Sequence, residues 1–96
     1  MSAGRKLDAG KSPWHLLPWD SAQSIVEVLA HGAKKYAPNN WKHVRGARDR
    51  YFSAAMRHTL AWYQGEQLDA ESGLPHLAHA ATDLLFLLWF DKRSAK

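Results

Sequence analysis

The sequence predicts an all-α fold, and three observations support that prediction. Apolar residues recur at the three-to-four spacing of an amphipathic helix near residues 20–36, 47–65 and 75–91. A Pro-Asn-Asn turn at residues 37–40 ends the first stretch, and Gly65 ends the second, as helix-stopping residues do. No stretch alternates apolar and polar residues as a half-buried strand does. We therefore expect a small bundle of three main helices with an extended N-terminal arm, completed by oligomerisation.

The chain is expected to form one domain between two polar ends. Residues 1–12 are small and polar without periodicity, which is typical of a flexible arm, and residues 92–96 form a charged tail. The domain then covers residues 13–91. Its first segment, residues 13–19, holds four large apolar side chains and two prolines that exclude a long helix. We expect this segment to lie extended over the core; the alternative is that Trp14 helps form an aromatic lid over a planar ligand.

The first helix is predicted to start at Asp20, a good N-cap residue, with Gln23 completing a capping box. Its polar stripe contains Glu27, His31 and Lys34, which are spaced at i, i+4 and i+7. By spacing alone this stripe is an ordinary solvated face with helical side-chain pairs. The opposite, apolar face is predicted from the residues with helical spacing: Ala22, Ile25, Val26, Leu29, Ala33 and Tyr36.

The second helix is expected to have a broad core face with a basic pair at its edge. Arg57 and His58 are adjacent, and a guanidinium at this position can clamp a phosphate with two hydrogen bonds. A surface arginine without a specific role is the alternative. The predicted core face consists of the following apolar and small residues: Tyr51, Phe52, Ala55, Met56, Thr59, Leu60, Trp62 and Tyr63.

The third helix is the most informative stretch. After Pro75, a residue suited to a first helical turn, His76, His79 and Asp83 fall on one stripe about 60° wide. The rest of this helix is apolar, which predicts burial. Two interpretations stay open: a ligand or metal site, or buried polar residues that hydrogen-bond one another.

Composition excludes several classes of function. The sequence has no cysteine, so disulfides and cysteine-based sites are excluded, and it shows neither a signal peptide nor an apolar run long enough to span a bilayer. The net charge is +4 at pH 7, but only seven basic residues face eight acidic ones between residues 12 and 91. Because polyanion binding needs a concentrated basic face, nucleic acid is an unlikely partner.

The candidate chemistry is phosphate chemistry with a divalent metal ion. Carboxylates suit Mg²⁺ or Mn²⁺, and imidazoles shift the preference towards Mn²⁺, Co²⁺, Ni²⁺ or Zn²⁺. The chain lacks the His-Glu-x-x-His order of zinc proteases, and Ser72 has no strained elbow that would make it a nucleophile. The candidate metal ligands share imidazole or carboxylate chemistry: Glu27, Asp69, Glu71, His76, His79 and Asp83.

Several blocks of the sequence resemble the phage dATP/dGTP diphosphohydrolases, the MazZ-like proteins, which are related to the all-α MazG-type NTP pyrophosphohydrolases. The resemblance covers roughly residues 4 to 90. It implies metal-dependent cleavage of a purine deoxynucleoside triphosphate to monophosphate and pyrophosphate, by an oligomer, in the phage or bacterial host cytoplasm. The matching blocks are Leu16-Leu17-Pro18, His31 to Tyr36 with Asn40-Trp41, Arg57-His58, Gly65 to Asp69, Glu71-Ser72-Gly73, and His76 to Ala80.

This resemblance suggests roles for the candidate residues. The Glu-x-x-Glu pair of MazG-type helices is absent, and Glu27, His79 and Asp83 become the predicted ligands of a Mg²⁺, Mn²⁺ or Co²⁺ ion. Glu71 or His76 would orient the attacking water as general base. The predicted substrate-binding residues neutralise the triphosphate or contact the purine: Lys34, Lys35, Trp41, Arg57 and His58.

Two further expectations concern class and assembly. The alternative to an enzyme is a non-catalytic nucleotide-binding or helical interaction module, in which the histidine stripe is structural. A single three-helix layer leaves Phe86, Trp89 and Phe90 hard to cover, and small residues on the same helix allow close approach of another helix. We therefore expect a homodimer or homotetramer.

Overall fold

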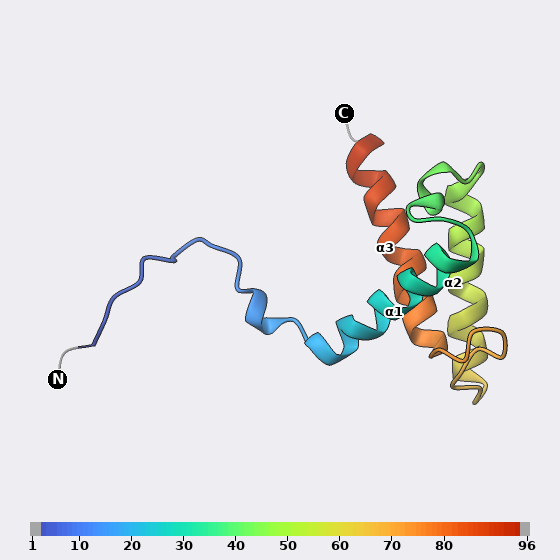
Figure 1. Ribbon diagram of the computed structural model, residues 1–96, viewed down its shortest axis with the longest axis horizontal. Helices are drawn as coiled ribbons and strands as arrows, with labels where there is room; N and C mark the ends of the chain where they lie inside the picture. Colours follow the sequence, from blue (N-terminus) through green and yellow to red (C-terminus); the bar gives the residue numbers. More distant parts are fainter. Residues whose placement is uncertain (1–2, 95–96) are drawn as a thin grey trace.

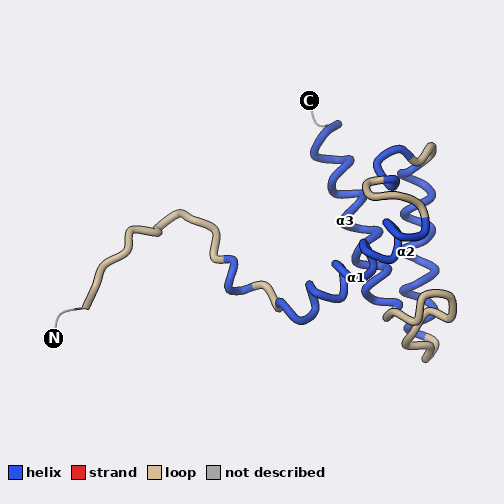
Figure 2. Tube along the Cα trace, viewed as in Figure 1, coloured by secondary structure: helices blue, strands red, loops and turns tan. Residues whose placement is uncertain are grey.

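The computed structural model describes residues 3–94, and its secondary structure is helical (Figure 2). No strand occurs within this range; one isolated bridge joins Leu68 and Pro75. The predicted all-α fold with three main helices is therefore confirmed. The elements in chain order are η1 (Trp14–Leu16), α1 (Trp19–Lys35), η2 (Asn40–His43), α2 (Ala47–Tyr63) and α3 (His76–Ser94).

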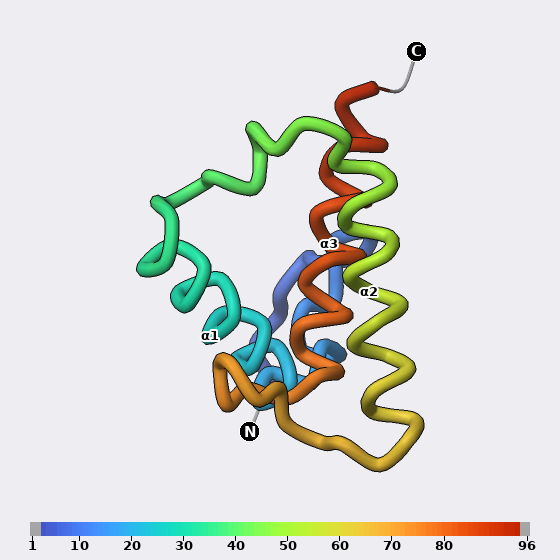
Figure 3. Tube along the Cα trace, turned by 90° about the vertical axis from the view of Figure 1, so that its right-hand side faces the viewer, coloured from blue at the N-terminus to red at the C-terminus, as the bar shows by residue number. Residues whose placement is uncertain are grey.

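The helices α2 and α3 form an antiparallel hairpin, which is the centre of the fold (Figure 1). Figure 3 shows α1 crossing beside the first half of α3, while the segment between α1 and α2 arches back to the far end of the hairpin. The loop between α2 and α3 closes the opposite end. The three helices thus diverge from one end of the molecule, and the polar stripe of α3 begins at that end.

Gly65 ends α2 as predicted. It has φ +105°, a conformation that disfavours side chains with a Cβ. The Gly65 N–H donates to the Trp62 carbonyl and the Glu66 N–H to the Ala61 carbonyl, both at 3.0 Å. These two bonds form a Schellman motif, which satisfies carbonyls at the end of the helix. The chain consequently turns back sharply and directs Glu66 towards the start of α3.

Small side chains form the contact between the helices. Ala55 of α2 and Ala78 and Ala80 of α3 are buried, and Thr82 is sealed with its hydroxyl donating to the Ala78 carbonyl at 2.7 Å. Small residues allow helices to pack closely, and here α2 of the same chain makes this approach. The prediction that α3 is buried all round is wrong, however. Leu84 and Leu88 are about half exposed, because α2 and α1 cover only part of its circumference.

Trp41 covers the aromatic residues in the second half of α3. Its ring stacks on Phe86, with centroids 4.2 Å apart, and meets Trp89 and Phe90 edge to face at 5.0 and 6.1 Å. Such pairs add about 0.5–1.5 kcal/mol each beyond their buried area. The arching segment with η2 therefore supplies the cover that the sequence alone did not predict, and the exposed apolar surface of α3 consists of leucines instead.

The N-terminal segment differs from its prediction. Residues 13–19 do not lie over the core: the chain before α1 projects away from the helices (Figure 1). Trp14 and Trp19 contact each other with centroids 6.4 Å apart, and both remain more than half exposed. The prolines at 13 and 18 bracket one 3-10 turn, η1, none of whose residues is buried. An aromatic lid formed by Trp14 is likewise not observed.

The start of α1 also corrects a sequence prediction. Asp20 lies in the first turn of α1 rather than at its cap, and its Oδ1 accepts from the Ser21 N–H at 2.8 Å. The charged tail predicted at 92–96 continues α3 to Ser94, and the positions at 1–2 and 95–96 lie outside the described residues. Among residues 3–94 no helix combines the length and the apolar character needed to cross a membrane.

Candidate functional site

Four imidazoles from all three helices meet where the α2–α3 loop joins α3. His58 of α2 stacks on His79 of α3, with centroids 4.5 Å apart, and lies 5.1 Å from the His76 ring. His31 of α1 meets His79 edge to face at 6.5 Å. Because His76 and His79 are three residues apart on α3, both face the same side and approach α2 together. His31, predicted on a solvated stripe, is half-buried here instead.

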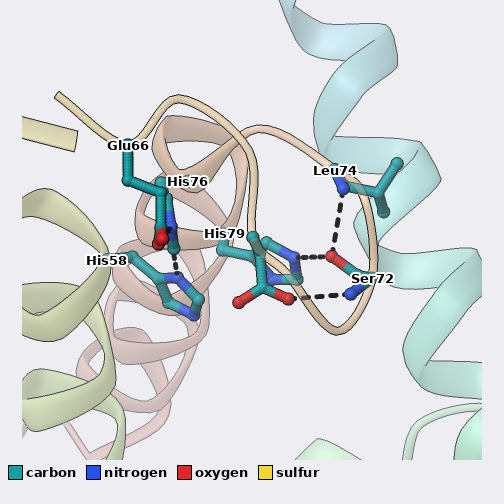
Figure 4. A network of polar contacts seen from close by, with 7 residues as sticks. His58, Glu66, Ser72, Leu74, His76 and His79 are labelled. Atoms are coloured by element: carbon teal, nitrogen blue, oxygen red, sulfur yellow. Dashed lines mark hydrogen bonds and ion pairs between the residues drawn. The ribbon is translucent and has the colours of Figure 1, made fainter. Parts of the chain in front are cut away.

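His76 links His58 to Glu66 in a hydrogen-bonded chain (Figure 4). Its Nε2 lies 2.6 Å from Glu66 Oε1, and its Nδ1 lies 2.8 Å from His58 Nδ1. An ionised carboxylate only accepts hydrogen bonds, so His76 Nε2 donates to Glu66. When the His76 ring is neutral, its lone pair is on Nδ1 and accepts from His58 Nδ1–H. Glu66 thereby sets the tautomers of two buried or half-buried histidines, which is the usual role of a carboxylate behind a metal-binding imidazole.

Asp69 adds an oxygen to the two imidazoles. His58, Asp69 and His76 each offer a ligand atom, and these atoms lie within 4.8 Å of one another. Two nitrogens and one carboxylate oxygen suit Mn²⁺, Co²⁺, Ni²⁺ or Zn²⁺ better than Mg²⁺ or Ca²⁺. The donor set and its Glu66 support therefore fit a divalent metal ion. We call these three residues the metal cluster.

The pKa values in this region favour the ligand forms of the side chains. Burial, followed by the nearby His79 and His76 rings, lowers the pKa of His58, so its imidazole is neutral at pH 7. Burial also lowers the pKa of His79, against the opposing charge of Asp69. Partial burial would raise the pKa of Asp69, but hydrogen bonds from Ser72, led by its backbone N–H, outweigh this and lower it. Neutral imidazoles and an ionised carboxylate are the forms that bind metals.

Ser72 holds the loop against His79. Its N–H donates to Asp69 Oδ2 at 2.8 Å, and its Oγ accepts from the Leu74 N–H at 3.1 Å (Figure 4). The same Oγ lies 2.7 Å from His79 Nε2. A serine with these three partners fixes the loop relative to the start of α3. His79, a predicted metal ligand, thus has its Nε2 engaged by Ser72.

An ion pair connects α1 to the acidic loop. Lys35 Nζ lies 2.7 Å from Glu71 Oε2, and both side chains are well exposed. The hydrogen bond between them raises the pKa of Lys35 and lowers that of Glu71. The structure therefore brings a predicted phosphate-binding lysine and a predicted general base into contact, beside the four imidazoles.

The predicted metal set is not brought together. Within residues 3–94 the group with metal-ligand spacing is the metal cluster, and Glu27, His79 and Asp83 do not form one. Glu27 is exposed on α1. Asp83 lies one turn beyond His79, where α3 has passed the loop, and it faces a different space. Helical periodicity placed His79 and Asp83 on one stripe correctly, but it could not show that their surroundings differ.

Asp83 lines a large cavity bounded by α1, the arching segment, α2 and α3. The cavity has a volume of about 1150 Å³. Burial raises the pKa of Asp83 to about 7, against a weak opposing attraction from Arg57, which lines the same cavity. Trp41, a predicted purine contact, also lines it but has Phe86 stacked on one face. Lys34 is exposed at the end of α1.

Two residues of the site were not selected from the sequence. Asp69 was considered as a metal ligand but was not chosen, and Glu66 was not considered. The signal that identifies them is the loop itself: Gly65 and Gly73 both have positive φ, so the chain between them folds back on itself. Backbone bonds from the Asp69 N–H to the Leu74 carbonyl, 2.8 Å, and from the His76 N–H to the Gln67 carbonyl, 2.9 Å, fix that return.

Comparison with known proteins identifies the family. Residues 1–96 match the family described as "dATP/dGTP diphosphohydrolase, N-terminal". The chain belongs to this family. A relative from Salmonella phage PMBT28, named dATP/dGTP diphosphohydrolase, is 37% identical over 86 residues, which are 90% of this chain. Those residues are 29% of the relative, so the chain spans less than a third of its length. No solved structure matches. The resemblance found in the sequence blocks is thus confirmed for the dATP/dGTP diphosphohydrolase family.

Proposed function

We propose that this domain catalyses metal-dependent hydrolysis of purine deoxynucleoside triphosphates to the monophosphate and pyrophosphate. The observation that supports it is the metal cluster, which lies inside the part of the chain that the named relative shares. The group fits a divalent ion, and Lys35 of α1 contacts Glu71 in the same loop as Asp69. Such an enzyme would act on the nucleotide pool of the phage-infected bacterial cytoplasm.

His58, Asp69 and His76 would hold the ion, in place of the predicted set Glu27, His79 and Asp83. The ion would supply positive charge against the phosphate oxygens. Glu66 would keep His76 in the required tautomer through the 2.6 Å bond to Nε2. Because both nitrogens of His76 are then occupied, the general-base role predicted for Glu71 or His76 is assigned to Glu71.

The Lys35–Glu71 pair would couple substrate binding to proton transfer. When Lys35 turns to the triphosphate, Glu71 loses its cationic partner and becomes a better proton acceptor. Water oxygen would form a bond to the α-phosphorus, its proton would pass to the Glu71 carboxylate, and the bond from the α-phosphorus to the bridging oxygen would break. Pyrophosphate leaves with that oxygen. Lys34 and Arg57 would add positive charge near the phosphates.

Pyrophosphate release tests this proposal. The chain is incubated with dATP or dGTP and Mg²⁺, Mn²⁺ or Co²⁺, with Asp69→Asn as the matched variant that loses a ligand charge. We expect release with Mn²⁺ or Co²⁺ and its loss in D69N. If no ion supports release while nucleotide still binds, the domain binds without cleaving. The observation favouring that alternative is the closed His58–His76–Glu66 chain, which satisfies its own hydrogen bonds.

We also propose that the domain works as a homo-oligomer. Its accessible surface is 7974 Å², whereas a compact monomer of 10.9 kDa exposes roughly 5,600 Å². Part of the excess is the projecting arm, and part is apolar surface on the hairpin: Phe52, Met56, Leu60 and Tyr63 on α2, with Leu77, Leu84 and Leu88 on α3. Exposed apolar patches of this kind mark interaction surfaces. Sedimentation giving a monomer of about 11 kDa at all concentrations would contradict the oligomer.

A further inference from the structure

Asp83 is a buried carboxylate without a hydrogen-bond partner among the described residues. Its side chain is only 9% exposed, and no hydrogen bond or salt bridge joins it to another residue in the range 3–94. In that range no side-chain oxygen or nitrogen is both sealed and unpartnered, so the Asp83 oxygens reach the cavity that it lines. Burial of a carboxylate without a compensating bond is costly. Such a group at a cavity wall is therefore suited to a ligand that supplies hydrogen-bond donors.

The cavity has the character of a small-molecule site. Its volume of about 1150 Å³ is at the upper end for ligand pockets, and aromatic side chains line much of it, among them Tyr51, Phe86 and Trp89. Polar groups are fewer in the lining. Among its charged residues, Arg57 and Asp83 are the closest in sequence to the metal cluster. A flat aromatic ring with an edge rich in N–H groups would match both features.

The distance to the metal cluster matches the length of a nucleotide. Asp83 follows His76 by seven residues on α3, which is two turns along the same helix face and roughly 10 Å of axial rise. A nucleotide spans a similar length from the far edge of its base to its α-phosphate. With the phosphates at the metal cluster, as in the proposed function, the base would extend along α3 towards Asp83, past Arg57, which adjoins His58 and lines the cavity.

We propose that this cavity is a nucleobase subsite in which Asp83 accepts hydrogen bonds from the N1–H and N2–H₂ groups of guanine. Above its pKa of about 7 the Asp83 carboxylate has two oxygens that only accept hydrogen bonds, and they pair best with two adjacent donors. Guanine presents such a pair. Adenine presents an unprotonated N1 beside its amine, and thymine presents one N–H between two carbonyls. The subsite thus favours guanine nucleotides over adenine nucleotides.

Binding of the three monophosphates dGMP, dIMP and dAMP tests this without requiring catalysis. Hypoxanthine, the base of dIMP, keeps the N1–H of guanine and lacks its amine. The full chain is titrated with each monophosphate in EDTA at about pH 8, where Asp83 is mostly ionised. Binding is followed by quenching of tryptophan fluorescence, because Trp41 and Trp89 line the cavity. We expect dGMP to bind most tightly, dIMP next and dAMP least. In Asp83→Asn the affinity for dGMP falls roughly 10-fold or more, because one acceptor becomes a donor.

The matched control is Asp91→Asn, an exposed carboxylate on the same helix, which leaves dGMP affinity unchanged. Equal binding of the three monophosphates, or unchanged dGMP binding in D83N with native circular dichroism, overturns the proposal. If D83N loses Mn²⁺ binding but keeps its preference for dGMP, the proposal is also overturned. Asp83 is then a metal ligand. If none of the monophosphates binds and the chain forms a concentration-dependent dimer, the proposal is also overturned, and a second copy of the chain is the occupant of the cavity. Guanine-selective binding without pyrophosphate release removes only the proposed function.

Discussion

The two ends of one face of α3 differ in how their polar groups are satisfied. At the start of the helix, His76 bonds both Glu66 and His58, and Ser72 contacts His79. Two turns later, Asp83 is equally enclosed but bonds to no other described side chain. The first region holds its geometry before any ligand arrives, as a metal site must. The second region leaves the Asp83 carboxylate without a hydrogen-bond donor, which lowers the stability of the fold. Changing one residue at a time in each region tests this difference.

The largest effect is expected from His76→Ala. The substitution leaves His58 and Glu66 without their shared partner and opens a cavity, so the free energy of unfolding should fall by roughly 3 kcal/mol. Urea denaturation measures this, and pyrophosphate release should fall to background. His15→Ala changes an exposed histidine of the arm and should change neither quantity. An H76A variant with wild-type stability and turnover would show that the two regions do not differ as described.

The next effect concerns the pH dependence of stability. The pKa of Asp83 is raised from 3.8 to about 7 in the folded chain, so the folded state binds more protons than the unfolded state between these values. The stability therefore falls as pH rises from about 4 to about 7, and Asp83→Asn removes this fall. At pH 8 the D83N variant should be more stable than the wild type by about 2 kcal/mol. The difference is smaller than the full pKa shift implies, because the cavity lets solvent reach the ionised carboxylate. Thermal unfolding from pH 4 to 8 measures it, and parallel curves for both proteins would contradict it.

A smaller effect is expected from Glu66→Gln. Glutamine keeps a hydrogen bond to His76 Nε2 but removes the charge that supports the imidazole. Affinity for Mn²⁺ or Co²⁺ should fall roughly 10-fold, with little change in the unfolding midpoint. Isothermal titration calorimetry measures the affinity, and D91N is the control for removing one carboxylate from the surface. Unchanged metal affinity would separate Glu66 from the metal cluster.

The smallest effect on stability is expected from Lys35→Ala. Its ion pair with Glu71 is exposed, and such pairs contribute little to folding, so the unfolding midpoint should not move. The KM for the deoxynucleoside triphosphate should rise, because a phosphate-binding cation is lost. Lys11→Ala, on the exposed N-terminal arm, is the matched control for charge. A change in stability with an unchanged KM would assign the pair a structural role.

The sequence predicted the helices better than their burial. Helix bounds followed from apolar periodicity and from residues such as Gly65, whose Schellman motif is a local property. Burial of residues 13–19 was predicted wrongly, and so was that of Leu84 and Leu88, because an apolar side chain does not specify what covers it. Trp41, expected near the ligand, packs on Phe86 because the arching segment returns to the hairpin.

The sequence by itself determined the family, the three helices and the stripe of His76, His79 and Asp83, since these depend on neighbours within a turn or a block. Only the tertiary structure decided that His58 meets His76, that Asp69 folds back beside both, and that Asp83 faces a cavity. Those contacts join α2, the loop and α3 across long separations in the chain, where helical spacing carries no information. The metal ligands proposed for this domain therefore come from three segments that only folding brings together.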